Sequence, residues 1–267
     1  DIIGPDSIDR IGEYDALFIR ENTHVNNHTY RMARKAQQAG LAVMYAPDAI
    51  LKCNNKAYLA EVMEAHHVPT PRTMIVHSEN RHEVGHMLGF PVVLKLPDST
   101  FSIGVEKART QEELEEKLDK ILADSVLAVA QEYMPSDFDW RVGVLDGKPL
   151  YACKYYMARG HWQIYNWGSA TKEGETGNFD TVKVDECDKH IMDAALKAVR
   201  AMVGDHGLFG VDVKEHKGRA YVIEVNECPN IDHGIEDVEL GDEIYRRIIG
   251  SLKKTIEKKI GIPNTVG

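Results

Sequence analysis

The sequence of 267 residues lacks several features that define whole classes of protein. It has no apolar run of about 18 residues, so it offers no membrane-spanning helix, and we find no signal-peptide pattern. Its 32 lysines and arginines are outnumbered by 42 aspartates and glutamates, and the net charge of −10 argues against nucleic acid or an anionic membrane as a partner. The 4 cysteines form no C-x-x-C pair, which favours a reducing, cytoplasmic setting over a disulfide framework or a zinc site.

The chain also lacks internal repeats, and it begins at Asp1 without a methionine. Because a strand pattern follows soon after, we expect the sequence to be part of a longer protein whose preceding residues are missing. With 43% apolar and 28% charged residues, the composition is ordinary for a globular protein of one large domain or two to three lobes.

The first part of the chain predicts a β-α-β unit of a parallel sheet. Strand patterns cover residues 14–21 and 41–47, and a helical pattern over 27–40 ends at Gly40. A second helix is predicted over residues 54–68, before a pair of prolines that stops it.

The rest of the chain predicts mainly antiparallel strands. A capping signal at Thr110 opens a helix, and Asp146–Gly147 and Lys217–Gly218 indicate hairpin turns. Residues 158–181 are glycine-rich and polar and predict a mobile loop. The mixture indicates α/β and α+β lobes, with a ligand expected between them.

Two acidic residues inside apolar strand patterns give the strongest chemical signal. Asp212 and Glu224 belong to neighbouring strands, and burying an unpaired carboxylate is costly. If the strands pair as a hairpin, both acids can face one side, and Asn226 joins them by the period of two. Such oxygen ligands suit Mg²⁺, which prefers one or two carboxylates together with substrate phosphates. The pattern predicts a magnesium–nucleotide site, unless both acids are surface positions of an edge hairpin.

Two lysines are candidates for binding the phosphates. Lys95 belongs to the strand pattern "VVLKL", where a buried lysine needs an anionic partner, although a lysine at a sheet edge can also extend to solvent. The following segment, "PDSTFSIGV", is typical of a phosphate-covering loop, although most such segments are plain turns. Lys56 opens the helix 54–68, and taken alone it is better explained as a solvated helix lysine.

Lys56 is followed along the chain by "FPVVLKLPDSTFSIGV", "AQEYMPSDFDWRVGV", "GVDVKE" and "VIEVNECPN". In this order the motifs strongly resemble the ATP-grasp carboxylate–amine ligases, specifically the RimK-like branch of glutamate ligases and glutathione-synthetase-like proteins. The resemblance runs over about residues 15–255, and the D-x(11)-E-x-N spacing is its most specific part.

The resemblance implies the ATP-grasp fold, in which two α+β lobes grip ATP. Residues 1–55 would be the C-terminal part of a parallel-sheet pre-ATP-grasp domain, and residues 56–131 the N-terminal lobe with the phosphate-covering loop. Residues 132–267 would be the C-terminal lobe, with the magnesium-binding hairpin and the last helix. A longer N-terminal region, as in some members, would explain the clipped start.

The resemblance also implies roles for individual residues. The magnesium ligands would be Asp212, Glu224 and Asn226, with Glu224 bridging two ions for which Mn²⁺ can substitute. ATP would be bound by Lys56, Lys95, the hinge residues Gln131, Glu132, Tyr133 and Met134, Asp139 near the ribose and Asn166 near the triphosphate. The catalytic residues would be Arg141 at the acyl-phosphate and Lys154 at the triphosphate, and Arg20 would bind a substrate carboxylate.

The chain departs from RimK-type proteins near Asn166. In those proteins an arginine usually lies a few residues before this asparagine, and here Gln163 is nearest to that place. The difference leaves the local phosphate contact and the identity of the substrate undetermined. The segment after Lys95 that resembles a phosphate-covering loop contains only one glycine, Gly104.

Two interpretations are open for several other residues. Trp162, Tyr165 and Trp167 either cap the substrate pocket or hold the glycine-rich segment in place. Residues 230–237 either touch the amine substrate or form a solvated loop or helix cap. Cys228 is better explained as a small buried filler than as a catalytic thiol.

The implied reaction is an ATP-dependent amide ligation. A substrate carboxylate attacks the γ-phosphorus of ATP to give an acyl-phosphate, and an amine then displaces phosphate. We expect glutamate or another amino acid to be added to a carboxylate acceptor, which is a peptide, a protein tail or a metabolite. Members often form homo-oligomers. Two other interpretations stay open: an ATP- and magnesium-binding regulatory module without turnover, and a phosphotransferase that stops at the phosphorylated carboxylate.

Overall fold

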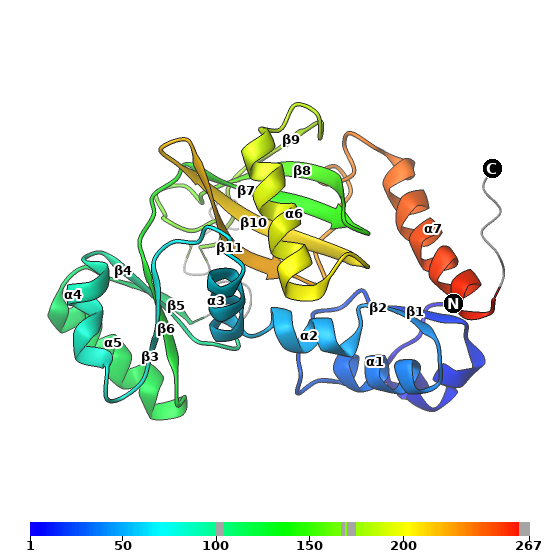
Figure 1. Cartoon of the computed structure of the whole chain (residues 1–267), viewed down its shortest axis with the longest axis horizontal. Coiled ribbons are helices and arrows are strands. Elements are labelled where there is room, and N and C mark those ends of the chain that lie inside the picture. Colours follow the sequence, from blue (N-terminus) through cyan, green and yellow to red (C-terminus); the bar gives the residue numbers. More distant parts are fainter. Residues whose placement is uncertain (100–103, 167–168, 170–174, 262–267) are drawn as a thin grey trace.

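Three β-sheets organise the computed structural model, which describes residues 1–99, 104–166, 169 and 175–261 (Figure 1). Within these residues, a two-stranded sheet is followed along the chain by a four-stranded and then a five-stranded sheet. Every helix of the described part is too short or too polar to span a bilayer. The predicted combination of α/β and α+β parts is confirmed.

The N-terminal part contains the predicted β-α-β unit. Its elements are η1 (Pro5–Glu13), β1 (Ala16–Phe18), α1 (His28–Gln38), β2 (Ala42–Met44) and α2 (Pro47–Cys53). Strands β1 and β2 pair in parallel, which confirms the unit. The Asn27 side chain caps α1 by accepting a hydrogen bond from the Thr29 N–H, and Gly40 follows the helix with a φ of 85°, which glycine adopts without strain. The sequence patterns did not predict η1 and α2, which both begin at a proline.

The four-stranded sheet has the order β3-β6-β4-β5 and packs against two helices. Its elements are β3 (Thr73–Val76), η2 (Arg81–Glu83), α4 (Val84–Leu88), β4 (Val92–Lys95), β5 (Val105–Ala108), α5 (Gln111–Asp124) and β6 (Ala128–Glu132). The predicted start of α5 is confirmed, because Thr110 Oγ1 accepts a hydrogen bond from the Glu113 N–H while the Glu113 carboxylate accepts one from the Arg109 N–H.

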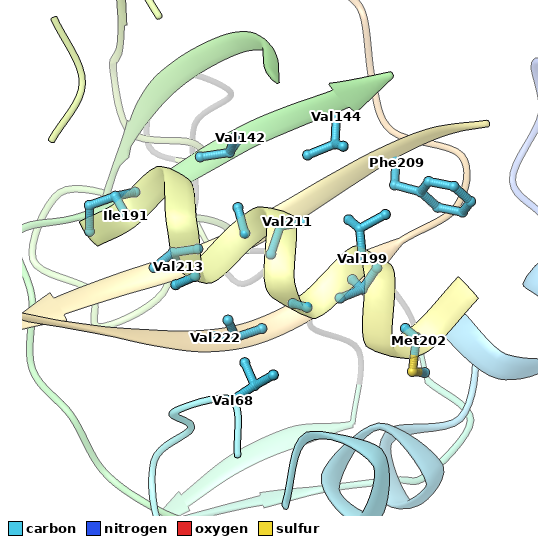
Figure 2. Packing of buried hydrophobic residues seen from close by; sticks show 14 of the residues in the cluster. Val68, Val142, Val144, Ile191, Val199, Met202, Phe209, Val211, Val213 and Val222 are labelled. Carbon is cyan, nitrogen blue, oxygen red and sulfur yellow. The ribbon is translucent and has the colours of Figure 1, made fainter. Parts of the chain in front are cut away.

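The five-stranded sheet is antiparallel and has the order β11-β10-β7-β8-β9. Its strands are β7 (Phe138–Leu145), β8 (Lys148–Tyr156), β9 (Phe179–Val182), β10 (Leu208–His216) and β11 (Arg219–Asn226). Helix α6 (Lys189–Val203) covers one face; Figure 2 shows its Ile191, Val199 and Met202 over the sheet residues Val142, Val211 and Val213. The prediction of a loop over 158–181 was wrong at its end, where β9 pairs with β8. Residues 167–168 and 170–174 of that loop lie outside the described residues.

Two helices pack across the borders of the three predicted parts. Leu59 and Met63 of α3 (Lys56–Ala65) join the core beneath α6, which belongs to the five-stranded sheet. Ile244 and Ile248 of α7 (Asp242–Lys259) join the core of the N-terminal part (Figure 1). The division into 1–55, 56–131 and 132–267 stays a prediction.

An irregularity in the β10–β11 hairpin decides which side chains share a face. Near the turn the ladder is regular, with His216 opposite Arg219, and continued unchanged it would place Asp212 opposite Ile223. A β-bulge between Asp212 and Val213 shifts the register by one residue, so that Asp212 lies opposite Glu224. Residues directly opposite each other point to the same face, so the bulge turns Glu224 toward the side of Asp212.

Candidate functional site

A cavity of about 210 Å³ is lined by residues of the N-terminal part and of both larger sheets. Most of the predicted site residues, including the catalytic candidate Arg141, are brought together here: Lys56, Lys95, Gln131, Glu132, Tyr133, Met134, Asp139, Arg141, Asp212, Glu224 and Asn226. Arg20, Lys154 and Asn166 are described by the structure and lie outside this lining.

Acidic and basic side chains pair with each other across the cavity. The Arg141 guanidinium donates two hydrogen bonds to Asp212, with Nε 2.8 Å from Oδ1 and Nη2 3.0 Å from Oδ2. The Lys56 ammonium lies 3.2 Å from Glu224 Oε1 and also donates to the Ser99 carbonyl. These charges are 11 to 28% exposed, and such poorly solvated charges are stable only when paired.

The strand ladders hold Arg141 in place. Arg141 in β7 lies directly opposite Asp212 in β10, so the two side chains point to the same face. The Arg141 guanidinium also lies over the ring of Tyr155, 4.6 Å from its centroid. The Tyr155 hydroxyl donates a hydrogen bond to Glu236, which is completely buried. Arg141 is therefore fixed by a carboxylate and by an anchored aromatic ring.

Lys95 is buried at the end of β4. Its ammonium donates a hydrogen bond to Gln131 Oε1 at 2.8 Å, and the Gln131 amide nitrogen donates to Thr73 Oγ1 at 2.9 Å. Burial lowers the pKa of Lys95 to about 8, whereas the charge of Glu224 acts in the opposite direction. Lys95 has no carboxylate within ion-pair distance among the described residues, so an anionic ligand would improve its environment.

Aromatic side chains form part of the cavity lining. Trp162 packs edge-on against Tyr133, with ring centroids 5.9 Å apart. The Lys107 ammonium lies over both rings, 4.2 Å from the Tyr133 centroid and 4.7 Å from that of Trp162. Trp162 and Tyr165 both line the cavity, and Trp162 also packs against the hinge residue Tyr133, so both interpretations stay open. Trp167 lies outside the described residues.

The position of Lys154 corrects the expectation that it faces the triphosphate. Its ammonium lies 5.0 Å from the ring centroids of both Phe138 and Trp140, and Trp140 belongs to the core beneath α6. Lys154 is opposite Trp140, whereas Arg141 is opposite Cys153, because the β7–β8 register shifts between Gly143 and Val144. That shift turns Lys154 to the face of the sheet away from Arg141.

Arg20 and Asn166 are next to the cavity. Arg20 is exposed, and its Nη1 donates to the carbonyl of Pro229 at 3.0 Å and to the Tyr45 hydroxyl at 3.4 Å. Because Pro229 lines the cavity, Arg20 lies one residue beyond the lining. The Asn166 N–H donates to the Glu175 carbonyl, and Asn166 directly follows the lining residue Tyr165.

The sequence patterns missed several polar residues of the lining. Glu227 is buried, accepts hydrogen bonds from Thr23 and from Asn54 at 2.8 Å, and has its pKa raised by burial to about 7. Lys214 forms an ion pair with Asp139, whose own pKa is raised by burial despite this partner. Lys214 could have been found, since it is two residues beyond Asp212 in one strand.

The segment 230–237 keeps both interpretations because Asn230 lines the cavity, whereas Cys228 is better explained as a structural residue. Burial raises the pKa of the Cys228 thiol to about 11, and its sulfur donates to the carbonyls of Ile19 and Glu21, so it is no reactive thiolate. In segment 230–237, Glu236 accepts hydrogen bonds from Tyr155 and from the Asp232 N–H and lies outside the cavity.

The donor set fits a divalent cation that is shared with a ligand. Within the described residues, no three histidine, cysteine or acidic side chains gather in a way that could hold a metal ion. Asp212, Glu224 and Asn226 instead offer two carboxylates and one amide, with the Asn226 amide nitrogen 3.4 Å from Asp212 Oδ2. Hard oxygen donors in this number suit Mg²⁺ completed by phosphate oxygens.

The placement of Lys154 predicts that Lys154→Met leaves the affinity for ATP within about twofold of the wild-type value, because no phosphate contact is removed. Lys95→Met, which removes a buried ammonium from the cavity, is expected to weaken ATP binding by about tenfold or more. Calorimetric titration of both variants measures the two effects. Equal losses would show that Lys154 reaches the nucleotide.

The lowered pKa of Lys95 predicts a pH dependence. ATP favours the charged ammonium, so the affinity for ATP should fall as the pH rises above about 8, where the free protein loses the Lys95 proton. The contribution of Lys95 to the free energy of unfolding changes with pH in the opposite direction. The unfolded chain, with the ordinary pKa of 10.5, binds more protons above pH 8, so this contribution rises with pH between the two values.

Titrations with ATP from pH 7 to 9.5 check this dependence. Lys95→Arg serves as the comparison, because an arginine stays charged over the whole range. If the ATP affinity of the wild-type protein follows the same pH profile as that of this variant, the pH dependence does not come from Lys95.

Comparisons with known proteins agree with this geometry. Residues 57–233 match the family model described as D-ala D-ala ligase C-terminus. The alpha-aminoadipate–LysW ligase LysX of Sulfurisphaera tokodaii is 24% identical over 93% of this chain and 85% of its own length. A protein of Marinomonas sp. named "Probable alpha-L-glutamate ligase" is 25% identical over 91% of this chain and 77% of its own length.

Solved structures show the same fold. D-alanine–D-alanine ligase from Bacillus anthracis is similar over 95% of this chain and 85% of its own, with a TM-score of 0.77 at 17% identity. D-cycloserine synthetase DcsG is similar over 92% of this chain and 85% of its own, with a TM-score of 0.68 at 15% identity. The family model covers well over half of the sequence, so the chain belongs to the D-ala D-ala ligase C-terminus family and is an ATP-grasp ligase.

Proposed function

We propose that this protein is an ATP-dependent ligase that joins an amino acid to a carboxylate acceptor through an acyl-phosphate. The observation that carries the proposal is the set of opposed charges in one cavity, where Lys56, Lys95 and Arg141 face Asp212 and Glu224. The basic residues suit a triphosphate and the acidic residues suit a divalent cation. The names of the LysX and glutamate-ligase relatives support an amino acid as one substrate.

In the proposed first step, the basic residues stabilise the charge of the transferred phosphoryl group. Lys56 and Lys95 bind phosphate oxygens, and Arg141 faces the negative charge that develops as the substrate carboxylate attacks. No covalent bond to the protein is required. Arg141 suits this task because the Tyr155 ring already fixes its guanidinium, so little reorganisation is needed.

Asp212, Glu224 and Asn226 would hold magnesium, and in our proposal Glu224 is shared between two ions for which Mn²⁺ can substitute. Bound magnesium would neutralise phosphate charge and act as a Lewis acid. We propose that Asp212 gives up a hydrogen bond from Arg141, and that Glu224 separates from Lys56, when they become ligands. The same exchange frees Arg141 and Lys56 for the phosphates.

The substrates are proposed to enter at the mouth of the cavity beside Pro229. Arg20 is exposed there, so a substrate carboxylate can reach its guanidinium. The acceptor would be a peptide, a protein tail or a metabolite. A cytoplasmic location is supported by four free cysteines, as expected in a reducing compartment.

The test is a screen of the common amino acids, singly and in pairs, for ATP-dependent phosphate release with magnesium. We expect at least one pair to give ADP, phosphate and a stable amide. Glu224→Gln should abolish the product without changing the fold, because it removes a charged ligand but no volume. Glu215→Gln is the matched control, since Glu215 is on the other face of the same hairpin, near His190.

Two results would replace the proposal. ATP that binds with magnesium but is not hydrolysed with any pair would identify a regulatory module. A hydroxamate trapped by hydroxylamine, without any amide from an amine substrate, would identify a phosphotransferase that stops after the first step.

A further inference from the structure

Lys214 is a partly buried cation of the cavity that the proposed mechanism does not use. It belongs to β10, two residues beyond Asp212, so both side chains point to the same face of the sheet. Its side chain is only 15% exposed and lines the cavity. A lysine this far from solvent needs a partner that is itself held in place.

The partner is Asp139, and the contacts of its two carboxylate oxygens differ. The Lys214 ammonium donates to Asp139 Oδ1 at 2.5 Å and to Ser136 Oγ at 2.6 Å. Ser136 Oγ donates to the same oxygen, Oδ1, at 2.9 Å. No hydrogen bond from a described residue reaches Oδ2 of Asp139. A buried carboxylate with one saturated and one open oxygen is suited to accept a hydrogen bond from a ligand.

The position of the pair along the cavity indicates which part of a nucleotide it meets. Asp139 and Lys214 are each two residues from Arg141 and Asp212, which is about 7 Å along a strand. They are displaced toward the start of β7, the end that the chain reaches directly after the hinge residues 131–134. If phosphates lie at Arg141 and a base at the hinge, the sugar between them lies beside Asp139.

We propose that Lys214 is a positioning residue that selects ribonucleotides. It holds Asp139 by Oδ1, together with Ser136, so that Oδ2 accepts a hydrogen bond from a hydroxyl of the ribose. This inference rests on the proposed function, because it requires ATP in the cavity. Lys214 does not touch the nucleotide; its effect is transmitted through Asp139.

The experiment compares the affinities for ATP, 2′-deoxyATP and 3′-deoxyATP by calorimetric titration with magnesium. The wild-type protein should bind ATP about tenfold or more tightly than at least one deoxy analogue, since a hydrogen bond to a charged acceptor is lost. In Lys214→Met this preference should shrink to about threefold or less, through weaker binding of ATP alone. Lys214→Arg should restore it, and Lys217→Met, an exposed lysine at the turn of the same hairpin, should leave it unchanged.

Other outcomes overturn the inference. A preference that persists in Lys214→Met shows that Asp139 needs no positioning, and equal losses for ATP and its deoxy analogues show that Lys214 contacts the phosphates directly. If Lys214→Met does not fold, Lys214→Gln carries the same comparison, because it keeps a long chain without the charge. A wild-type protein that binds ATP and its deoxy analogues equally refutes this inference alone, whereas one that binds no ATP refutes the proposed function.

Discussion

The mutual neutralisation of buried charges in one cavity is the constraint on which the rest of the structure depends. Acids and cations with little exposure to solvent are costly to bury unless a partner of opposite charge or a hydrogen-bonding group meets them. Here Arg141 pairs with Asp212, Lys56 with Glu224 and Lys214 with Asp139. A triphosphate with its cation carries both signs of charge, so it can take over the first two pairs without leaving a charge unpaired. We infer that the paired charges of the cavity match the charges of a triphosphate and its cation.

Two register shifts in the five-stranded sheet determine which charges face this cavity. In a regular β10–β11 hairpin, Asp212 would be opposite Ile223, and Glu224 would point to the other face. In a regular β7–β8 hairpin with the same turn, Lys154 would be opposite Asp139 and would face the cavity. One bulge therefore brings Glu224 into the cavity, and the other turns Lys154 away from it.

These shifts also explain how far the sequence could predict the site. The turns at Asp146–Gly147 and Lys217–Gly218, the cap at Thr110 and the β-α-β unit depend on local residue preferences, so local patterns were sufficient. The bulges depend on how neighbouring strands and the core beneath α6 pack, which no local pattern contains. Strand β9 pairs with β8 but is only 4 residues long, so its sequence was too short to stand out from the glycine-rich segment before it. The motif order predicted the family, whereas the faces of Glu224 and Lys154 required the structure.

The central claim is that phosphates and a metal ion exchange partners with the paired charges, and the linkage between ATP and magnesium tests it most directly. Calorimetric titration of ATP, with and without magnesium, is compared between the wild-type protein and Glu224→Gln. For the wild type, magnesium should raise the affinity by about tenfold or more. In the variant, metal-free ATP should bind at least as tightly as to the wild type, because Lys56 is already free, and the gain from magnesium should fall to about threefold or less. An equal gain from magnesium in both proteins, together with weaker metal-free binding in the variant, would contradict the account.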